Sequence, residues 1–549
     1  MDAHLVEARS GAVVTARKLR LDIHSIIVPI LVTIVAAVGI VLRGYGLSRG
    51  LWFDEAYSFW IARQPLLDVP RLLRVYDTHP PFYYALFHVW MAVAGHSEAV
   101  MRIPSALAGA ALIPLTFLLA RRLGGTSLGL LAAGMVAVSP YLIAASQEAR
   151  MYPFLAVFTL GATYALLLGV EDGRRQHWVA YTGLMGLAVY THHFALLVLL
   201  AHAVYVVMLW RRSLSLKRWL ACGIVIVVLY LPLVPSLPLQ VVTVRSWPSI
   251  RPPLRLSDLA DVFALWSFGG GLFGTATYFR KGFYSGVIPE TCVLSPLRFT
   301  DPSPPKVCLD QPAYPFIVLV PFVLLVLAGV SRLGRRGRLL VLACWLVPFL
   351  VVTLVSLQWN LFQKRYFSFL TPFFSVLVAA GVLQTIRMVR HVRPAAAAAG
   401  LLVVLSAYTI PALFAYFTAP PTHDWRAAAG YVRERASPED VLLFMPAFTR
   451  LPFEYYYRGG QATVSINPRE ILEGRRAVGF RVESDSGAIT ALARRHPRMW
   501  IIAAAPIGVE GRRELFQRVS GSFREAAGAG FGYVYVFRWD SLRFTPGTR

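Results

Sequence analysis

Residues 51–84 read LWFDEAYSFWIARQPLLDVPRLLRVYDTHPPFYY and follow a long apolar segment. They place the carboxylates of Asp54 and Glu55 side by side among several aromatic side chains. Aromatic side chains favour the boundary between lipid headgroups and hydrocarbon, where an ionised carboxylate needs hydrogen bonds, cations or water to offset its burial. The stretch therefore predicts an acidic site at a membrane surface. A structural alternative is that Asp54 caps a juxtamembrane helix and that Glu55 is simply solvated.

The composition of the chain is that of a polytopic membrane protein. Its 549 residues are 56% hydrophobic and 15% charged, which is too little charge to cover a water-facing surface. The formal net charge is +25, but the arginines stand in short runs between apolar segments, not along one aromatic-rich face. Such runs are topology signals and contacts for anionic lipids, so we expect no nucleic-acid partner.

The lengths of the apolar segments and the positions of the basic runs between them predict about eleven transmembrane helices, each of ~20 residues. Basic residues precede the first span and no small-residue cleavage pattern follows it, which predicts a retained signal anchor with a cytoplasmic N-terminus. The apolar run Phe82–Ala94 is too short to cross, so we expect a helix lying in the interface. An odd number of spans places the C-terminus outside. The predicted spans are residues 23–42, 101–120, 126–144, 152–170, 177–192, 194–210, 218–236, 313–331, 339–357, 367–386 and 395–417.

Two short segments at the outer membrane boundary carry further polar side chains. The segment SQEARMYP contains Glu148, Arg150 and Tyr152. On a helix Glu148 and Tyr152 share a face while Glu148 and Arg150 point apart, so the two charges can serve different partners; the alternative is a helix end with snorkelling side chains. In YTHHF, His192 and His193 lack a nearby Cys or carboxylate at metal-ligand spacing, which favours interfacial hydrogen bonding over a metal site.

The longest loop between spans, residues 237–312, contains Cys292 and Cys308, whereas Cys222 and Cys344 fall inside apolar spans. Two cysteines confined to one extracytoplasmic loop predict a disulfide that closes a ring of ~17 residues. The bridge would stabilise the loop by about 3 kcal/mol in the loop-entropy model.

Lys364 and Arg365 begin a span on the side opposite the other basic runs, against the positive-inside trend. One interpretation is an interfacial anchor beside Tyr366. The other is a pair of cations that binds a phosphate.

The composition changes after residue 417. From residue 420 to 549, helical patterns (424–435, 483–495 and 510–519) alternate with short apolar runs (441–445, 499–504 and 533–537). This alternation predicts a small α/β domain with a sheet. We therefore expect two domains: a transmembrane catalytic domain over residues 1–419 and an extracytoplasmic α/β domain over residues 420–549.

Four segments taken together carry a family resemblance: WFDEAYSFW, THPPFYYALFHVW, RIPSALAGAALIPLTFLLARRLGG and SQEARMY. They resemble the bacterial GT-C glycosyltransferases. More narrowly, they resemble the polyprenyl-phosphate-sugar-dependent branch related to dolichyl-phosphate-mannose protein mannosyltransferases and the aminoarabinose transferase of lipid A. The resemblance covers about the first 210 residues and, loosely, the element beginning RYF at Arg365.

The resemblance implies that an acidic residue of the first external loop, which maps to Asp54 with Glu55 beside it, acts on the acceptor. The resemblance also implies that the residue before the Pro-Pro pair, often basic and near the donor phosphate, maps to His79, which stands where some relatives carry a Lys. A lipid-linked sugar phosphate presents its phosphate at headgroup level, so Asp54 would accept the acceptor's proton while Lys364 or Arg365 stabilises the departing phosphate.

In this mechanism Glu148 and Arg150 would orient sugar hydroxyls or Asp54 itself. Because no second nucleophilic carboxylate is required, we expect a single displacement that inverts the anomeric carbon. The reaction requires no cofactor, and a divalent metal is compatible with it.

The expected protein is a multi-pass enzyme of the bacterial inner membrane. It would move one hexose or pentose from a polyprenyl-phosphate-linked donor to a hydroxyl of an envelope glycan, lipid or protein. A lipid-linked sugar flippase would instead carry ionisable residues at the middle of its spans, which are nearly free of charge here. A polysaccharide polymerase or ligase would differ in the size of its donor.

Overall fold

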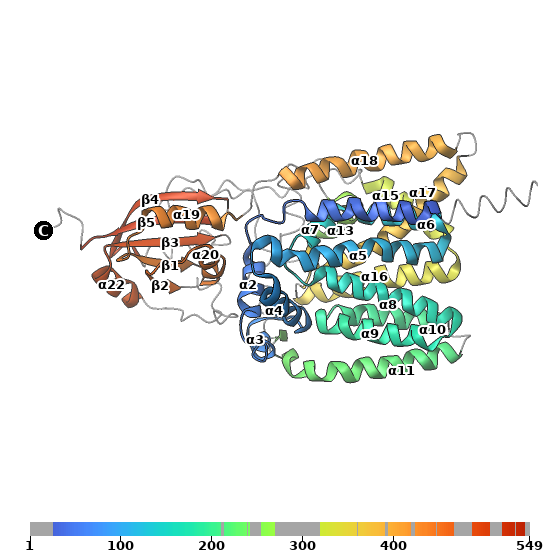
Figure 1. Ribbon diagram of the computed structural model, residues 1–549, viewed down its shortest axis with the longest axis horizontal. Coiled ribbons are helices and arrows are strands. Elements are labelled where there is room, and N and C mark those ends of the chain that lie inside the picture. The colour runs from blue at the N-terminus through green and yellow to red at the C-terminus, as the bar shows by residue number, and fades with distance from the viewer. Residues whose placement is uncertain are drawn as a thin grey trace, which may run out of the picture.

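A computed structural model of the chain describes residues 26–209, 213–238, 240–241, 254–269, 319–359, 361–389, 394–418, 423–445, 447–465, 486–504, 519–532 and 534–543. The molecule is elongated, with a bundle of long helices at one end and a sheet domain at the other (Figure 1). Three short helices, α2, α3 and α4, lie at the end of the bundle that faces the sheet domain (Figure 1).

Each of the eleven predicted spans contains a helix. These helices are Ile26–Gly44, α5 (Glu98–Gly124), α6 (Thr126–Val138) with α7 (Pro140–Ser146), α8 (Tyr152–Asp172), α9 (Arg175–Thr191), α10 (Ala195–Met208), α11 (Ser213–Tyr230), α15 (Val320–Arg332), α16 (Arg335–Trp359), α17 (Thr371–Met388) and α18 (Pro394–Thr418).

Six helices in the described ranges are long and apolar enough to cross a membrane, and seven if the bent pair α6 and α7 counts as one span. Shorter apolar helices of 10–17 residues occupy three more predicted spans, in α10, α15 and α18. A multi-pass helical membrane fold with a small C-terminal sheet is therefore confirmed. The number of eleven crossings stays a prediction.

The bend of 58° between α6 and α7 has a local cause. Pro140 has no N–H group, so the carbonyl of Val136 loses its partner four residues on. Arg43, which is 1% exposed, replaces it: its guanidinium donates to the carbonyls of Val136 and Ala137, both at 3.0 Å, and to Ser146 Oγ at 3.2 Å. These bonds attach the helix Ile26–Gly44 to the bend between α6 and α7. They also offset the cost of burying the Arg43 charge in apolar surroundings.

The juxtamembrane helices are α2 (Phe53–Ala62), α3 (Val69–Tyr76) and α4 (Phe82–Ala94). The predicted short helix at Phe82–Ala94 is confirmed as a helix. Helix α2 has Trp52, not Asp54, as its N-cap residue, and the Glu55 carboxylate reaches back to the Trp52 N–H at 3.2 Å. The interpretation of Asp54 as a cap is therefore wrong, and Glu55 is not solvated, because its side chain is 0% exposed.

The C-terminal sheet has five strands in the order β2-β1-β3-β5-β4. β1 (Val441–Met445) pairs in parallel with β2 (Ala462–Ser465) and β3 (Arg498–Ala504), and β5 (Val534–Ser541) pairs antiparallel with β3 and β4 (Phe523–Phe531). Helices α19 (Trp425–Arg435), α20 (Arg450–Tyr456) and α22 (Ser486–Arg495) accompany it. The alternation of helical and apolar segments correctly predicted α19, α22, β1, β3 and β5. Residues 510–518 of the third predicted helix lie outside the described residues.

Alternate residues of β1 enter separate hydrophobic cores on the two faces of the sheet, with Leu443 on one side and Phe444 on the other. The helical bundle has its own large core, and a further core joins α2, α4, Tyr152 and Tyr366 with Leu451 of the sheet domain. The division near residue 420 stays a prediction.

Cys222 and Cys344 are free and buried within α11 and α16. The predicted bridge between Cys292 and Cys308 falls outside the described residues.

Candidate active site at the juxtamembrane helices

Asp54 and Arg365 form an ion pair at the end of the bundle. Asp54 lies in the first turn of α2, and Arg365 lies in η4 (Lys364–Leu370), the short helix that leads into α17. Their Oδ2 and Nη1 atoms are 2.8 Å apart, and the two side chains are 15% and 13% exposed. The Arg365 guanidinium also lies over the rings of Trp52 and Tyr366, at 5.0 and 5.7 Å from the ring centres. The pair is therefore held firmly but keeps access to solvent.

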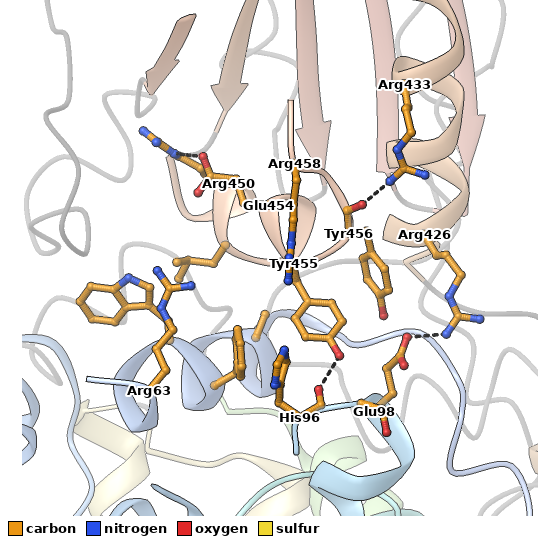
Figure 2. A pocket seen from close by; sticks show the side chains of 15 residues that line it. Arg63, His96, Glu98, Arg426, Arg433, Arg450, Glu454, Tyr455, Tyr456 and Arg458 are labelled. Carbon is orange, nitrogen blue, oxygen red and sulfur yellow. Dashed lines mark hydrogen bonds and ion pairs between the residues drawn. The ribbon is translucent and has the colours of Figure 1, made fainter. Parts of the chain in front are cut away.

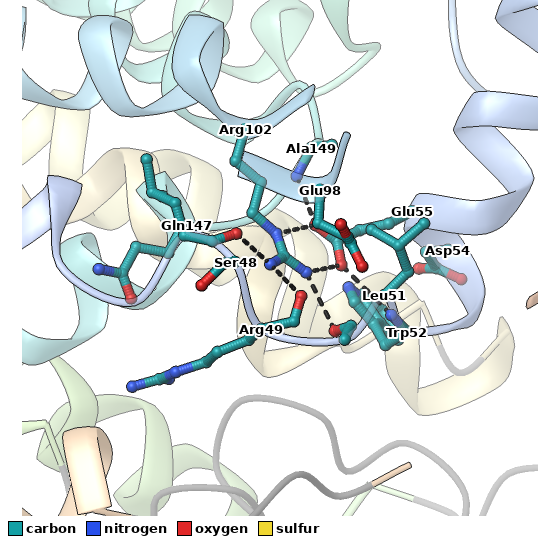
Figure 3. A network of polar contacts seen from close by, with 12 residues as sticks. Ser48, Arg49, Leu51, Trp52, Asp54, Glu55, Glu98, Arg102, Gln147 and Ala149 are labelled. Atoms are coloured by element: carbon teal, nitrogen blue, oxygen red, sulfur yellow. Dashed lines mark hydrogen bonds and ion pairs between the residues drawn. The ribbon is translucent and has the colours of Figure 1, made fainter. Parts of the chain in front are cut away.

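Glu55 makes a different, fully buried pair with Arg102 of α5 (Figure 3). The guanidinium donates to both carboxylate oxygens, at 2.7 and 2.6 Å, and the Ala149 N–H donates to Oε1 at 2.9 Å. Arg102 also donates to the carbonyls of Leu47 and Arg49, so it holds the chain that precedes α2. Figure 3 shows Glu55 turned toward Arg102 and Asp54 turned away. Of these two adjacent residues of α2, Glu55 therefore has a structural role in the buried pair, and Asp54 lies at the surface of the site.

Arg150 lies beneath Asp54 and is 3% exposed. Its Nη1 group donates to the Asp54 carbonyl at 3.3 Å, to Ser58 Oγ at 2.7 Å and to the Tyr84 hydroxyl at 3.3 Å. The guanidinium is thus bonded to α2 and α4 together, and it adds a buried positive charge near the partly exposed Asp54 carboxylate.

Asp77 and His79 form a second acid–base group beside Arg150. The His79 Nδ1 atom is 2.5 Å from Asp77 Oδ1, and the Tyr84 hydroxyl donates to Asp77 Oδ2. Burial alone would raise the pKa of the Asp77 carboxyl, but the charge and hydrogen bond of His79 and the charge of Arg150 hold that pKa well below its usual range. Asp77 is therefore ionised and keeps His79 oriented.

His192 and Tyr152 pack against this group. The His192 ring lies 5.1 Å from that of His79 and 5.7 Å from that of Tyr366, and the Tyr152 ring lies 5.8 Å from that of Tyr366. The Phe194 N–H donates to His192 Nδ1, which leaves the proton of a neutral ring on Nε2. Burial lowers the pKa of His192 well below 6.5, so the ring is neutral.

His193 has a different hydrogen-bond partner, the Tyr230 hydroxyl, which lies 2.8 Å from its Nδ1 atom. Glu148 is 3% exposed and lies one residue before the Ala149 amide that binds Glu55. The structure therefore brings Asp54, His79, Arg150, Tyr152 and His192 together, with Glu148 in the adjoining scaffold.

Lys364 is bonded to two carboxylates of α13 (Leu256–Phe268). Its Nζ atom pairs with Asp261 and lies 3.5 Å from Asp258. The two acidic residues are one helical turn apart, so both face the lysine. Although Lys364 and Arg365 are adjacent, their charges serve different partners, and Arg365 is the one beside Asp54.

Sequence reasoning missed Arg102, Tyr84, Asp258 and Asp261. Arg102 left a detectable signal, because it is a charge inside a predicted span and such a residue needs a buried partner. The two aspartates lie in the long loop, whose helix α13 was not expected. Within the described ranges, no three His, Cys, Asp or Glu side chains are grouped as metal ligands would be.

One family model matches a part of the helical bundle. Residues 78–235 match the family model described as dolichyl-phosphate-mannose-protein mannosyltransferase. This segment begins just after Asp77, includes His79, Arg150 and His192, and ends shortly after α11. No protein of curated function matches the sequence.

Solved structures of similar fold cover almost the whole chain. ArnT from Cupriavidus metallidurans, solved in the apo state and bound to undecaprenyl phosphate, is 15% identical with a TM-score of 0.55, over 93% of this chain and 97% of that one. The archaeal oligosaccharyltransferase AglB from Archaeoglobus fulgidus, in complex with an inhibitory peptide and a dolichol-phosphate, is 14% identical with a TM-score of 0.51, over 95% and 75%. The match to the mannosyltransferase model and the shared architecture identify this chain as a membrane protein of the GT-C glycosyltransferase fold.

Proposed function

We propose that this protein is a glycosyltransferase that moves a single sugar from a polyprenyl-phosphate-linked donor to an acceptor hydroxyl. The observation that carries the proposal is the Asp54–Arg365 ion pair, a partly exposed carboxylate and guanidinium 2.8 Å apart at the end of the bundle. A base for the acceptor and a cation for the phosphate are what such a transfer needs at one place.

In the proposed reaction the acceptor oxygen attacks the anomeric carbon and its proton passes to Asp54. The bond between the anomeric carbon and the phosphate oxygen breaks, and the polyprenyl phosphate leaves with the electron pair and an additional negative charge. The Arg365 guanidinium stabilises that charge with two parallel N–H groups. A single displacement of this kind inverts the anomeric carbon.

Donor binding must compete with Asp54 for Arg365. When a phosphate takes over part of the guanidinium, the Asp54 carboxylate loses its contact with Arg365, and its Oδ2 atom is free to accept the proton of the acceptor hydroxyl. Arg150, which is fixed by its bonds to Ser58 and Tyr84, keeps Asp54 in place during this exchange. The carboxylate would thus be released to act as the base only when a donor is bound.

The solved structures support the carrier lipid in this proposal, because ArnT was solved with undecaprenyl phosphate and AglB with a dolichol-phosphate. We propose that the site faces the outer side of a bacterial inner membrane, with the N-terminus in the cytoplasm and the sheet domain outside. The acceptor would be an envelope glycan, lipid or protein.

The test is transfer by the purified protein with short-chain polyprenyl-phosphate hexoses and pentoses, using cell-envelope extract as the acceptor. Asp54→Asn keeps the shape of the side chain and removes the base, so we expect transfer to fall by ~100-fold or more. Asp68→Asn is the matched control, because Asp68 is exposed just before α3. Near-normal turnover by Asp54→Asn would show that Asp54 is not the base.

A further inference from the structure

A cavity of about 790 Å³ lies between the juxtamembrane helices and the sheet domain. Its walls come from α2, from the turn before α5, and from α19 and α20 of the sheet domain. Figure 2 shows side chains from both parts of the molecule lining one space. The two parts are held together at its edge, where the Tyr455 hydroxyl donates to the His96 carbonyl at 2.7 Å.

The cavity is strongly basic. Five arginines and two glutamates line it, which leaves an excess of three positive charges; the arginines are Arg63, Arg426, Arg433, Arg450 and Arg458. Three of them are bonded within the cavity wall. Arg426 pairs with Glu98 at 2.5 Å, Arg450 pairs with Glu454 at 2.5 Å, and Arg433 donates to the Tyr456 carbonyl.

The remaining two arginines come from different parts of the molecule, and neither has an ion-pair partner in the described part of the chain. Arg63 ends α2, and its guanidinium lies 5.8 Å from the centre of the Phe59 ring. Arg458 follows α20 and is exposed. Two unneutralised guanidinium groups that line one cavity favour a ligand with carboxylate or phosphate groups.

Aromatic rings lie among these charges. Phe59 and Trp60 contribute from α2, and Tyr455 and Tyr456 contribute from α20. Rings that present an apolar face and a polar edge suit ligands that are themselves partly apolar and partly hydroxylated, as sugar rings are. Arginines interleaved with aromatic rings therefore fit an anionic glycan better than a simple inorganic anion.

The cavity is separate from the Asp54–Arg365 pair. At 100° per residue, Phe59, Trp60 and Arg63 fall on the face of α2 opposite Asp54. The two places are thus divided by the thickness of one helix, about 10–12 Å with side chains. A ligand that reaches both must be extended, and its charged groups must stand several bonds from the hydroxyl that reacts.

We propose that this cavity binds the acceptor, and that the acceptor is an extended glycan carrying carboxylate or phosphate groups. This inference rests on the proposed function, since it assigns a substrate class to the same enzyme. The cavity holds the charged part of the glycan while a hydroxyl farther along the chain reaches Asp54. The sheet domain then has a defined role, because it supplies four of the five arginines.

The test measures binding without turnover. The probes are a fluorescent oligogalacturonide, a neutral malto-oligosaccharide of equal length, and phosphatidylglycerol nanodiscs, each with the detergent-purified full-length protein. The variant is Arg63→Gln with Arg458→Gln. The control is Arg71→Gln with Arg74→Gln, which removes the same charge from exposed positions of α3 outside the cavity.

We expect the oligogalacturonide to bind the unaltered protein, more weakly at high salt, and the cavity variant to lose affinity by about tenfold or more. The control variant should stay within about twofold. Equal loss in both variants, equal binding of the neutral glycan, or loss only of phosphatidylglycerol binding would each overturn the proposal. The last result would make the arginines a lipid-headgroup contact.

A second measurement separates this proposal from the proposed function. In the absence of acceptor, slow hydrolysis of the donor depends on the Asp54–Arg365 site alone. The cavity variant should keep donor hydrolysis and raise the KM for an anionic acceptor at unchanged kcat. If Asp54→Asn loses transfer while the cavity variant keeps its acceptor KM, the enzyme assignment stands and the acceptor site is wrong. If the oligogalacturonide binds as expected but no donor is ever consumed, the cavity is an anionic-glycan site and the enzyme assignment is wrong.

Discussion

Arg365 has two roles in the proposed reaction, since it pairs with Asp54 before the donor arrives and with the phosphate afterwards. Its contact with the phosphate strengthens as charge builds on the leaving group, so Arg365→Ala should lower kcat by ~100-fold and raise the donor KM. Arg365→Lys should restore only part of the rate, because one ammonium cannot reproduce two parallel N–H groups. The measurement is steady-state kinetics with a soluble short-chain donor.

Lys364→Ala is the comparison for this prediction, since Lys364 is adjacent in the chain but bonded to Asp261 and Asp258. Loss of its side chain should lower the stability of the protein and leave the donor KM nearly unchanged, because it leaves two carboxylates without their cation. If Lys364→Ala raises the donor KM more than Arg365→Ala does, Lys364 binds the phosphate and the assignment to Arg365 is wrong.

His193 predicts a pH dependence of stability. Burial and the charge of His79 lower the pKa of His193 from 6.5 to about 4 in the folded protein. Below pH 6.5 the unfolded chain binds a proton that the folded chain does not, so stability falls as the pH drops from 6.5 to about 4. In the His193→Gln variant, the free energy of unfolding should therefore fall by about 1–3 kcal/mol less over this pH range than in the unaltered protein.

Thermal melts of the detergent-purified protein across this pH range provide the measurement. Part of the loss should remain in the variant, because the pKa of His192 is lowered too. Identical slopes of melting temperature against pH in both proteins would contradict the assignment.

At the scale of elements, the Glu55–Arg102 pair joins α2 to α5. Arg102→Gln leaves a carboxylate buried without its cation and should cost about 3–5 kcal/mol. Glu55→Gln with Arg102→Gln removes both charges and should recover part of that loss. A double-mutant cycle on thermal stability isolates the coupling between the two residues. Additive effects would mean that the pair does not fix α2.

Across the two parts of the molecule, the sheet domain contacts the start of α2, the helix that carries Asp54. The Leu51 N–H donates to the Tyr456 hydroxyl at 2.8 Å, three residues before Asp54. Tyr456→Phe removes that acceptor, so the peptide around Leu51 should exchange its amide hydrogens faster, by about tenfold. Tyr431→Phe, whose ring packs on Trp500 and Phe531 within the sheet domain, is the control. Hydrogen-exchange mass spectrometry measures both, and equal exchange in the two variants would show that the domains are not coupled through this bond.

Local patterns in the sequence were sufficient to locate most elements. Apolar lengths and basic runs located the helices of the bundle because a helix in lipid satisfies its own backbone and shows an uninterrupted apolar run. The strands β2 and β4 were missed. β4 reads FREAAGAGF, which is rich in Ala and Gly and poor in the branched side chains that signal a strand, and both strands lie at edges of the sheet.

Reading the sequence was enough to identify the charged residues that gather at the end of the bundle near the sheet domain: Asp54 beside Glu55, Glu148 close to Arg150, and Lys364 next to Arg365. The pairing of these charges depends on contacts between distant segments, which are visible only in the folded chain. Neighbours in the chain took different partners, since Glu55 turned to Arg102 and Asp54 to Arg365. The reason is geometric: adjacent side chains on a helix point in directions 100° apart. They therefore contact different segments of the chain and pair with different residues. The basic cavity between α2 and α20 exists only because two such segments, far apart in sequence, pack together.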